Sequence, residues 1–394
     1  MTKSRQIIGF LATALVLCSL GFAQEAAKPA PPRRMAFQTT PNDTVVSPEV
    51  HPDKTVTFRL YAPEAKSVKV TGEWGVSPEE AHKAYQGIDL QAAPDGVWSV
   101  TVGPLPPGTF RYNFLVDGAI VSDPRNPNVS QSLSLVRGMV SIPGLDYQDL
   151  QDVPHGAVAT VWYQSKALGT LRRMHIYTPP GYETGKIKYP VFYLLHGAMD
   201  TDDCWPTVGR ANTIMDNLIA AGQAKPMIVA MPAGHTQSTF QFGDRSALTR
   251  HNFEKDFEQD IVPYVESHYR VLSGRNNRAI AGLSMGGSQT LNVALTHPDE
   301  FAYIGVFSSG WILQNPEDIE KEFATGLNDD RGKKGIKVFW FATGKDDGLL
   351  STTQSTVELL KKHGFNVEFQ ETAGLHNFIN WRDYLHQFAP RLFK

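Results

Sequence analysis

The fold is decided by residues 278–287, which read RAIAGLSMGG. Its apolar part, 278–281, predicts a short strand, and a helix is expected over 288–297. Between them, the pattern G-x-S-x-G around Ser284 matches the strand, sharp turn and helix of a nucleophile elbow. Small neighbours let such a turn close around a serine held in a strained backbone. We therefore expect Ser284 to be a nucleophile. The alternative is a glycine-rich packing turn with an unreactive serine.

The chain around this turn alternates between buried strands and helices. Continuous apolar runs cover 191–195, 227–231 and 338–341, as expected for strands buried on both faces of a parallel sheet. Apolar residues of 253–268 recur at steps of three and four, which predicts an amphipathic helix. The alternation indicates an α/β domain wound on one sheet over residues 160–394.

A reactive serine needs a base to take its proton and a carboxylate to orient that base. Four histidines follow Ser284. His297 closes a helix, His363 lies late in a helix, and His386 lies inside the final helical segment. His376 instead occupies a loop after a predicted strand, where a base is expected in a sheet of this kind. We predict that His376 is the base, with a structural loop histidine as the alternative.

Two aspartates follow the predicted buried strand 338–344, in the chain order Ser, Asp, His. One of Asp346 and Asp347 would orient the base, and the other would accept backbone N–H bonds in the turn. The residues alone leave this choice open.

An oxyanion that forms during acyl transfer needs preorganised N–H donors. One donor is expected at Met285, directly after the nucleophile. The other is expected in the loop 194–199, where His196 and Gly197 end a predicted strand and let the backbone turn.

The N-terminal half has a different period. Short segments that alternate apolar and polar residues are separated by Gly and Pro clusters, which predicts a β-sandwich over residues 42–145. The Pro- and Ala-rich residues 24–41 and the polar residues 146–159 are expected to be linkers. The alternating segments are 55–60, 67–70, 97–102 and 110–116.

Residues 1–23 have the pattern of a secretory signal peptide. Lys3 and Arg5 precede an apolar stretch and a small-x-small site that ends at Ala23. We expect export and cleavage after Ala23, because the apolar run is short for an uncleaved membrane anchor. The mature chain would keep Cys204 alone, so neither an intrachain disulfide nor a thiolate metal site is expected.

The formal charge of −3 would become −5 once Lys3 and Arg5 are removed. The sequence contains no block of Lys and Arg residues, so we expect no nucleic-acid partner. We also expect no stable membrane insertion after cleavage. The sequence has no H-E-x-x-H, no G-x-x-x-x-G-K-[ST] and no G-x-G-x-x-G after a strand, so we predict no metal and no cofactor. A glycoside hydrolase that uses a pair of carboxylates is another possible class of enzyme, but it would leave the G-x-S-x-G turn around Ser284 without a role.

Several stretches of residues 160–393 together resemble the esterase-D-like branch of the α/β-hydrolases, which includes feruloyl and acetyl-xylan esterases of carbohydrate esterase family one. The resemblance implies an α/β-hydrolase fold with a mostly parallel central sheet. It also implies that Asp347 is the acid, three residues after the glycine that ends its strand, and that Ala198 and Met285 supply the oxyanion donors. The matching stretches are 177–182, 193–197 with Trp205, 261–266, 282–287, 344–347, and His376 with Trp381.

Residues 42–143 resemble the early-set, immunoglobulin-like module related to the glycogen-branching-enzyme carbohydrate-binding type. The likeness lies in 56–63, 96–98, 112–118 and the Asp-Pro pair at 123–124. Trp74, Tyr85 and Trp98 could stack on sugar rings, although buried aromatics are the commoner use in a sandwich. We expect a domain that packs beside the active site rather than an independent sugar binder.

These observations predict a secreted serine ester hydrolase, periplasmic or extracellular, that acts through an acyl-enzyme on a small-molecule or polysaccharide-linked ester. The resemblance favours feruloyl or acetyl groups on plant polysaccharide. A siderophore esterase, an acyltransferase and a non-catalytic glycan-binding protein are the alternatives. The residues expected to contact the substrate are Trp205, Trp311 and His196, with Phe240 and Phe242 as further aromatic candidates.

Overall fold

The computed structural model describes residues 39–237, 247–312 and 314–394. The predicted signal peptide, 1–23, and most of the predicted linker 24–41 lie outside the described residues, as do Phe240 and Phe242. Within the described ranges, no helix combines the length and the apolar character needed to cross a membrane.

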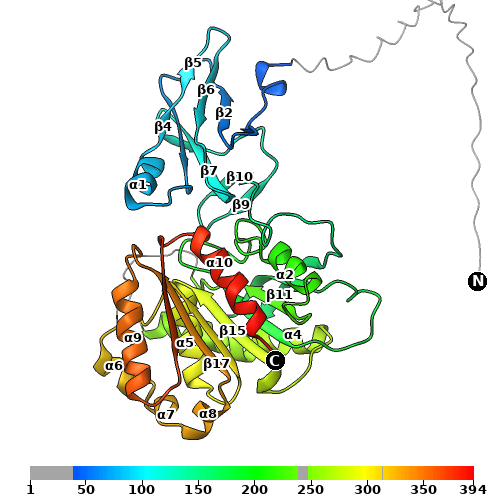
Figure 1. Cartoon of the computed structure of the whole chain (residues 1–394), viewed down its shortest axis with the longest axis vertical. Helices are drawn as coiled ribbons and strands as arrows, with labels where there is room; N and C mark the ends of the chain where they lie inside the picture. Colours follow the sequence, from blue (N-terminus) through cyan, green and yellow to red (C-terminus); the bar gives the residue numbers. More distant parts are fainter. Residues whose placement is uncertain (1–38, 238–246, 313) are drawn as a thin grey trace, which may run out of the picture. The chain divides into compact units, whose positions relative to one another are not determined.

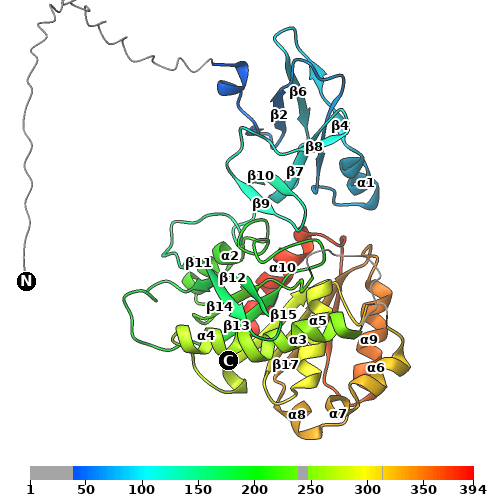
Figure 2. The same cartoon turned by 180° about the vertical axis from the view of Figure 1, so that it is seen from behind.

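An eight-stranded sheet organises the C-terminal half of the chain (Figures 1 and 2). Its strand order is β11-β12-β14-β13-β15-β16-β17-β18. All neighbours from β14 to β18 run parallel, whereas β12 is antiparallel to both β14 and β11. The predicted α/β-hydrolase fold with a mostly parallel sheet is thus confirmed. The strands are β11 (Ala157–Ser165), β12 (Thr170–Thr178), β13 (Val191–Leu195), β14 (Ile228–Pro232), β15 (Arg278–Leu283), β16 (Tyr303–Phe307), β17 (Val338–Gly344) and β18 (Glu368–Thr372).

The central strands are buried on both faces. In β13, Tyr193 and Leu195 belong to one hydrophobic cluster, while Phe192 and Leu194 belong to a second. Because successive side chains of a strand point to opposite faces, a sheet covered by helices on both sides needs an unbroken apolar run. Burial of each such side chain contributes about 1.5–3 kcal/mol. This requirement explains the runs seen in the sequence.

Helices cover the sheet on its two faces. The first cluster includes side chains of α3 (Ala247–Asp256), the π-helix η2 (Phe257–Ile261), α4 (Val262–His268), α5 (Met285–Thr296), α6 (Pro316–Glu322), α7 (Ala324–Leu327) and α9 (Leu350–Lys362). The second includes side chains of α2 (Ala211–Ala220) and α10 (Phe378–Phe388). The short helix α8 (Asp330–Gly335) precedes β17.

Two element boundaries differ from the sequence-based expectation. Helix α5 begins at Met285 rather than near residue 288, because Ser284 itself occupies the N-cap position. Strand β11 begins at Ala157, inside the predicted linker 146–159. Most of its side chains are exposed, so it lacks the apolar alternation that marks a strand in a sequence.

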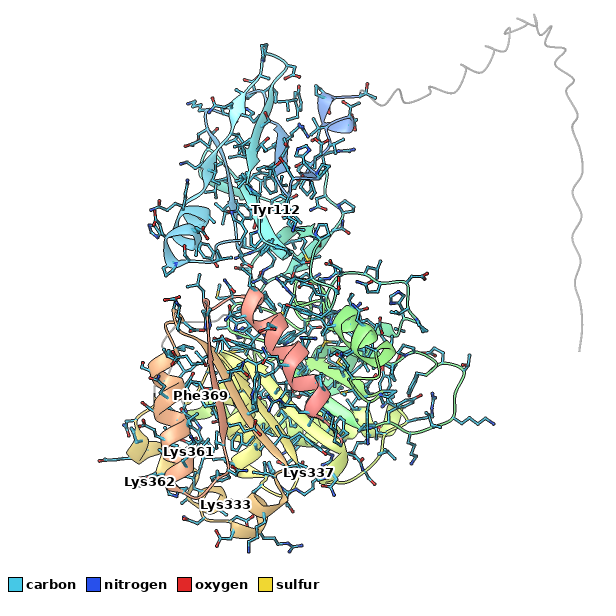
Figure 3. The ribbon with its side chains drawn as sticks, viewed as in Figure 1. Tyr112, Lys333, Lys337, Lys361, Lys362 and Phe369 are labelled. Atoms are coloured by element: carbon cyan, nitrogen blue, oxygen red, sulfur yellow. The ribbon has the colours of Figure 1, made fainter. Side chains whose placement is uncertain are left out.

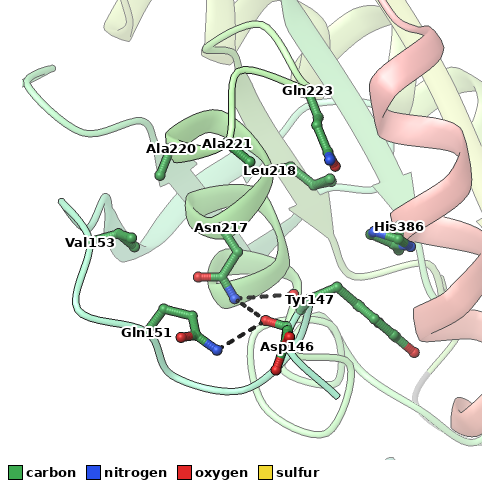
Figure 4. Close-up of a pocket in the computed structure, with 10 residues that line it drawn as sticks. All are labelled: Asp146, Tyr147, Gln151, Val153, Asn217, Leu218, Ala220, Ala221, Gln223 and His386. Atoms are coloured by element: carbon green, nitrogen blue, oxygen red, sulfur yellow. Dashed lines mark hydrogen bonds between the residues drawn. The ribbon is translucent and has the colours of Figure 1, made fainter.

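The segment before β11 packs against α2 (Figure 4). The Nδ2 atom of Asn217 donates to the carbonyl oxygens of Asp146, Tyr147 and Asp149 at 3.0, 3.2 and 2.9 Å. The ring of Tyr147 stacks on His386 with centroids 4.4 Å apart. These residues border a cavity of about 630 Å³.

Two antiparallel sheets form the N-terminal β-sandwich, as predicted. Their strand orders are β1-β2-β6-β5 and β4-β3-β7-β10-β9, with β8 also paired to β7. Phe58 and Phe114 pack against Tyr112 in the core, where Tyr112 is labelled in Figure 3. The elements are β1 (Glu49–Val50), β2 (Val56–Tyr61), β3 (Val68–Gly72), α1 (Pro78–Gln86), β4 (Ile88–Asp89), β5 (Gln91–Ala92), β6 (Val97–Val102), β7 (Gly108–Val116), β8 (Ala119–Val121), β9 (Val129–Gln131) and β10 (Val136–Ile142).

Candidate active site

Ser284 lies in a tight turn between β15 and α5. Its φ of 51° and ψ of −120° are rarely adopted by residues other than glycine. A Cβ atom at Gly282 would lie 2.3 Å from the carbonyl carbon of Gly286. A Cβ atom at Gly286 would in turn lie 2.5 Å from the carbonyl oxygen of His196. The turn therefore closes only with glycine at both positions.

The side chains of Ser284, His376 and Asp347 form a hydrogen-bonded chain. The Nε2 atom of His376 lies 3.0 Å from the Oγ of Ser284. The Nδ1 atom of the same ring lies 3.0 Å from each carboxylate oxygen of Asp347. If Nδ1 carries the proton and donates to the carboxylate, Nε2 is free to accept the serine proton. Ser284 follows β15 and His376 follows β18, so the predicted nucleophile and base meet at the carboxyl ends of strands of the same sheet.

Asp347 is held as a carboxylate. Burial alone would raise its pKa, but the hydrogen bond and charge of His376 and the N–H of Leu349 outweigh that effect. The pKa of Asp347 consequently lies below its usual range. Asp346 is exposed and contributes its backbone N–H to the carbonyl oxygen of Gly374 at 3.1 Å. Of the two aspartates, Asp347 is the one in contact with His376.

The other histidines after Ser284 have different partners. His297 lies 3.4 Å from Glu258, and His363 lies 3.0 Å from Glu320. His386 stacks on Tyr147, as described above.

His196 fixes the loop after β13. Its Nε2 accepts the N–H of Gly234 at 2.7 Å, so its Nδ1 carries the proton and donates to the carbonyl oxygen of Gly197 at 2.8 Å. Burial lowers the pKa of His196, which keeps the ring neutral and stabilises this arrangement. Met199 follows with a φ of 66°. The loop turns sharply, and Ala198 faces the same cavity as Ser284.

Met285 is the first residue of α5, so its N–H is one of the donors that a helix leaves unpaired at its start. The start of a helix also favours negative charge. The two predicted oxyanion donors therefore belong to segments that meet at Ser284. Met285 follows it directly, and Ala198 follows Gly197, where an added Cβ atom would lie 3.3 Å from the Cβ of Ser284.

A cavity of about 280 Å³ contains Ser284 and His376. It is smaller than the 630 Å³ cavity beside α2 in Figure 4, whose lining lacks both the serine and the base that the chemistry requires. From the hydrolase domain the lining includes Ala198, Met199, Phe378 and Trp381. From the β-sandwich it includes Glu73, Tyr85, Arg111, Ser132 and Arg137.

The β-sandwich is bonded directly to the loop that carries Ala198. Arg111 of β7 donates through Nη1 to the Oδ1 of Asp200, and both side chains are buried. The N–H of Leu133 donates to the carbonyl oxygen of Met199 at 2.8 Å, and Ser132 forms a β-bridge with Asp200. The sequence does not predict this contact, because nothing in the chain order relates Arg111 to Asp200.

The structure does not bring Trp205, Trp311 and His196 to the cavity beside Ser284. All three side chains are buried, with residue exposures of 1%, 2% and 1%, and none lines the cavity beside Ser284. The Nε1 of Trp205 donates to the carbonyl oxygen of Leu195 at 3.0 Å, and that of Trp311 to the Oδ1 of Asn292 at 3.2 Å. Both indoles are core residues whose one polar atom is satisfied internally. The aromatic residues that do line the cavity are Tyr85, Phe378 and Trp381.

Within the described residues, no cluster of three or more His, Cys, Asp or Glu side chains could hold a metal ion. Cys204 is buried, and burial raises the pKa of its thiol.

Two family models match the chain. Residues 165–392 match a putative esterase family. Residues 46–127 match carbohydrate-binding module 48, the isoamylase N-terminal domain. The two family resemblances inferred from the sequence are confirmed.

Curated relatives include an endo-1,4-beta-xylanase/feruloyl esterase of Xylanibacter ruminicola, 34% identical over 358 residues, which are 88% of this chain and 46% of that protein. The endo-1,4-beta-xylanase Y of Acetivibrio thermocellus is 29% identical over 202 residues, 48% of this chain and 18% of that protein. The chain thus spans less than half the length of these relatives.

Among solved structures, a CE1 ferulic acid esterase from Anaeromyces mucronatus is 25% identical, with a TM-score of 0.53 over 64% of this chain and 96% of that one. The enterobactin esterase of Shigella flexneri is 18% identical, with a TM-score of 0.60 over 85% of this chain and 92% of that one. The latter likeness concerns the fold alone.

Proposed function

The chain belongs to the putative esterase family of carboxylic ester hydrolases, and from this premise we propose that it is a serine esterase with Ser284 as nucleophile, His376 as base and Asp347 as orienting acid. The observation that carries the proposal is the unbroken hydrogen-bonded chain from Ser284 Oγ through the imidazole to a buried carboxylate, with 3.0 Å at each link.

The reaction follows from this geometry. Ser284 Oγ attacks the ester carbonyl carbon while its proton passes to Nε2 of His376. The N–H groups of Ala198 and Met285 stabilise the oxyanion of the tetrahedral intermediate. His376 then returns the proton to the leaving alcohol oxygen as the C–O bond breaks, leaving an acyl-serine. Water, deprotonated by the same imidazole, attacks the acyl-serine carbonyl. His376 returns that proton to Ser284 Oγ as the acyl C–Oγ bond breaks, which releases the carboxylic acid and restores the serine.

We propose feruloyl or acetyl groups on xylan as the substrate class. Support comes from the names of the relatives: a xylanase/feruloyl esterase at 34% identity, and CE1 ferulic acid esterases among the solved structures. Phe378 and Trp381 in the cavity wall offer apolar surface suited to an aromatic acyl group. Siderophore esters form the second class to test, because the enterobactin esterase shares the fold over 85% of the chain.

Export is a separate part of the proposal. The pattern of residues 1–23 predicts that a host that recognises the leader would secrete the chain. Mass spectrometry of the secreted protein is expected to find Gln24 at its N-terminus, and an intact Met1 in the secreted fraction would contradict cleavage.

The test of the esterase proposal is an assay on methyl ferulate, acetylated xylan, a p-nitrophenyl ester and enterobactin. Wild-type protein is expected to hydrolyse the p-nitrophenyl ester, and Ser284→Ala to lose roughly five to six orders of magnitude in kcat. Ser288→Ala is the matched control, because its hydroxyl contacts the carbonyl oxygen of Gly310 from the same helix. Turnover that persists in Ser284→Ala, or none in wild type, would refute the proposal.

A further inference from the structure

The cavity beside Ser284 continues onto the surface of the β-sandwich. A second cavity of about 190 Å³ lies there, lined by β3, β7 and β8 residues that include Thr71, Asn113 and Ile120. The two cavities share four lining residues: Glu73, Tyr85, Arg111 and Arg137. At 280 and 190 Å³ each is below the usual range for a ligand site, about 300–1,000 Å³, whereas together they fall within it. We treat them as one groove.

In the proposed reaction the leaving alcohol departs beside His376, whose loop contacts the β-sandwich. That alcohol must receive its proton from His376 Nε2, so it lies beside the imidazole. The next residue, Asn377, donates through Nδ2 to the carbonyl oxygen of Gly75 at 3.3 Å. Gly75 belongs to the connection between β3 and α1, and α1 carries Tyr85. The loop of the base and the sandwich wall are therefore in direct contact where the alcohol would depart.

The polar wall around these shared residues carries no net charge once Asp200, which lines the first cavity, is counted. Glu73 accepts from Arg111 Nε at 2.8 Å and from Arg137 Nη1 at 2.5 Å, and Arg111 also bonds Asp200. Two guanidinium groups thus face two carboxylates. Such a wall gives no preference to an ionic ligand and offers donors and acceptors to hydroxyl groups.

Two side chains of the sandwich wall each have a polar atom without a hydrogen-bond partner in the described structure. These atoms are the Nε of Arg137 and the Oγ of Ser132, and both are closed to solvent. Because an unsatisfied buried donor is unfavourable, a shift of these side chains toward a bound hydroxyl or water would stabilise them.

Tyr85 is the exposed aromatic residue of this wall. It is 56% exposed, whereas Trp74 is 6% exposed in the sandwich core and Trp98 donates its Nε1 to the carbonyl oxygen of Ala62. Of the three aromatics considered for sugar stacking, Tyr85 is the one that lines the groove. Its amphipathic ring suits a partly wet site that contacts a sugar face.

We propose that this groove binds the alcohol part of the ester, a neutral polyhydroxylated group with at least one sugar ring beyond the ester oxygen, and that Tyr85 determines this specificity. The inference rests on the proposed function, because it requires an ester whose alcohol departs toward His376. The β-sandwich then serves as half of the active-site cleft.

The test uses two substrates with the same acyl group: methyl ferulate, and ferulate esterified to arabinose on a xylo-oligosaccharide. In the full chain, Tyr85→Ala is expected to lower kcat/KM for the oligosaccharide ester roughly 3- to 10-fold through KM, and to leave methyl ferulate within two-fold. Tyr85→Phe keeps the ring and is expected to restore the wild-type ratio. Trp162→Ala is the matched control, an equally exposed aromatic (56%) on β11 that does not line the groove.

The outcomes separate the two proposals. If Tyr85→Ala keeps the wild-type kcat/KM on both substrates, the subsite is overturned. An equal loss of kcat/KM on both substrates would also overturn it, because that result indicates a structural role. A wild type that hydrolyses methyl ferulate but not the oligosaccharide ester would also overturn it while leaving the esterase intact. A wild type inactive on both substrates and on the p-nitrophenyl ester would refute the proposed function itself.

As an independent measurement, the oligosaccharide without ferulate is expected to inhibit methyl ferulate hydrolysis competitively in wild type and several-fold more weakly in Tyr85→Ala. Equal inhibition of both proteins would place the sugar elsewhere and overturn the assignment of Tyr85.

Discussion

The two walls of the cavity beside Ser284 are built in different ways. The hydrolase wall consists of loops at the carboxyl ends of parallel strands, and Ser284, Asp347 and His376 follow β15, β17 and β18 in chain order. The sandwich wall consists of side chains from α1, β7, β10 and the loops after β3 and β9 of a separate antiparallel domain. The first wall is fixed by the topology of one sheet, and the second by contacts between domains. We expect the first to control whether the reaction occurs and the second to control its rate and substrate choice.

Among the variants that compare the two walls, the largest effect on activity is expected in the hydrolase wall. Asp347→Asn is predicted to lower kcat by about 10³- to 10⁴-fold, because an amide can hold His376 in the wrong tautomer and does not stabilise the imidazolium. Stopped assays on the p-nitrophenyl ester measure this loss.

Asp346→Asn is the matched control for that change. Its side chain is exposed and one residue away, so its kcat is expected to stay within two-fold of wild type. If Asp346→Asn lost more activity than Asp347→Asn, the assignment of the acid would be reversed.

The difference between the walls also decides what the sequence could reveal. The position of Ser284 in a turn between a strand and a helix was predictable because the G-x-S-x-G pattern is local. The position of His376 after a strand was predictable because chain order and strand ends constrain where a base can lie. The choice of Asp347 over Asp346 needed a family resemblance, since both follow the same strand and only the turn geometry separates them. Within 55–60 and 97–102 the alternating pattern predicted strands correctly, because one face of each packs against a core.

The sandwich wall could not be predicted in this way. Arg111 and Asp200 are 89 residues apart and lie in different domains, so no local pattern links them. Trp205 and Trp311 were expected at the substrate and are packed in the core, because composition and position do not tell an indole that lines a pocket from one in the core. Tyr85 was weighed as a sugar contact, but only the packing of α1 distinguishes it from Trp74 and Trp98.

A smaller effect is expected from the contact between the walls. Arg111→Met removes the cation that bonds Asp200 next to the loop of Ala198, so the oxyanion donor is held less firmly. We predict a fall in kcat of about 10- to 100-fold, less than the full loss of an oxyanion donor, with KM for the p-nitrophenyl ester changed by less than three-fold. The split between kcat and KM distinguishes a positioning role from substrate binding.

Controls for this variant address folding. Arg111→Met leaves the buried carboxylate of Asp200 without its guanidinium partner, whereas Glu73 keeps Arg137, so circular dichroism and thermal unfolding accompany the assay. Asp200→Asn keeps an acceptor for the guanidinium and is expected to lose less kcat than Arg111→Met. Arg59→Met removes a more exposed ion pair with Glu49 elsewhere in the sandwich and is expected to leave kcat unchanged. An Arg111→Met protein that folds with wild-type kcat would break the proposed link between the walls.

The smallest effect on activity is expected from the core tryptophan that the sequence placed at the substrate. Trp205 is 1% exposed, bonds the carbonyl oxygen of Leu195 and packs edge-on against Phe378 at 5.9 Å. Trp205→Phe leaves that carbonyl without its donor and a small void behind it, so urea unfolding is expected to show a loss of about 1–3 kcal/mol. KM on methyl ferulate is expected to stay within two-fold, because no atom of the ring can reach a ligand through the wall. A several-fold rise in KM at unchanged stability would instead mean that the indole is part of the binding surface, and that the hydrolase wall extends deeper than its lining residues indicate.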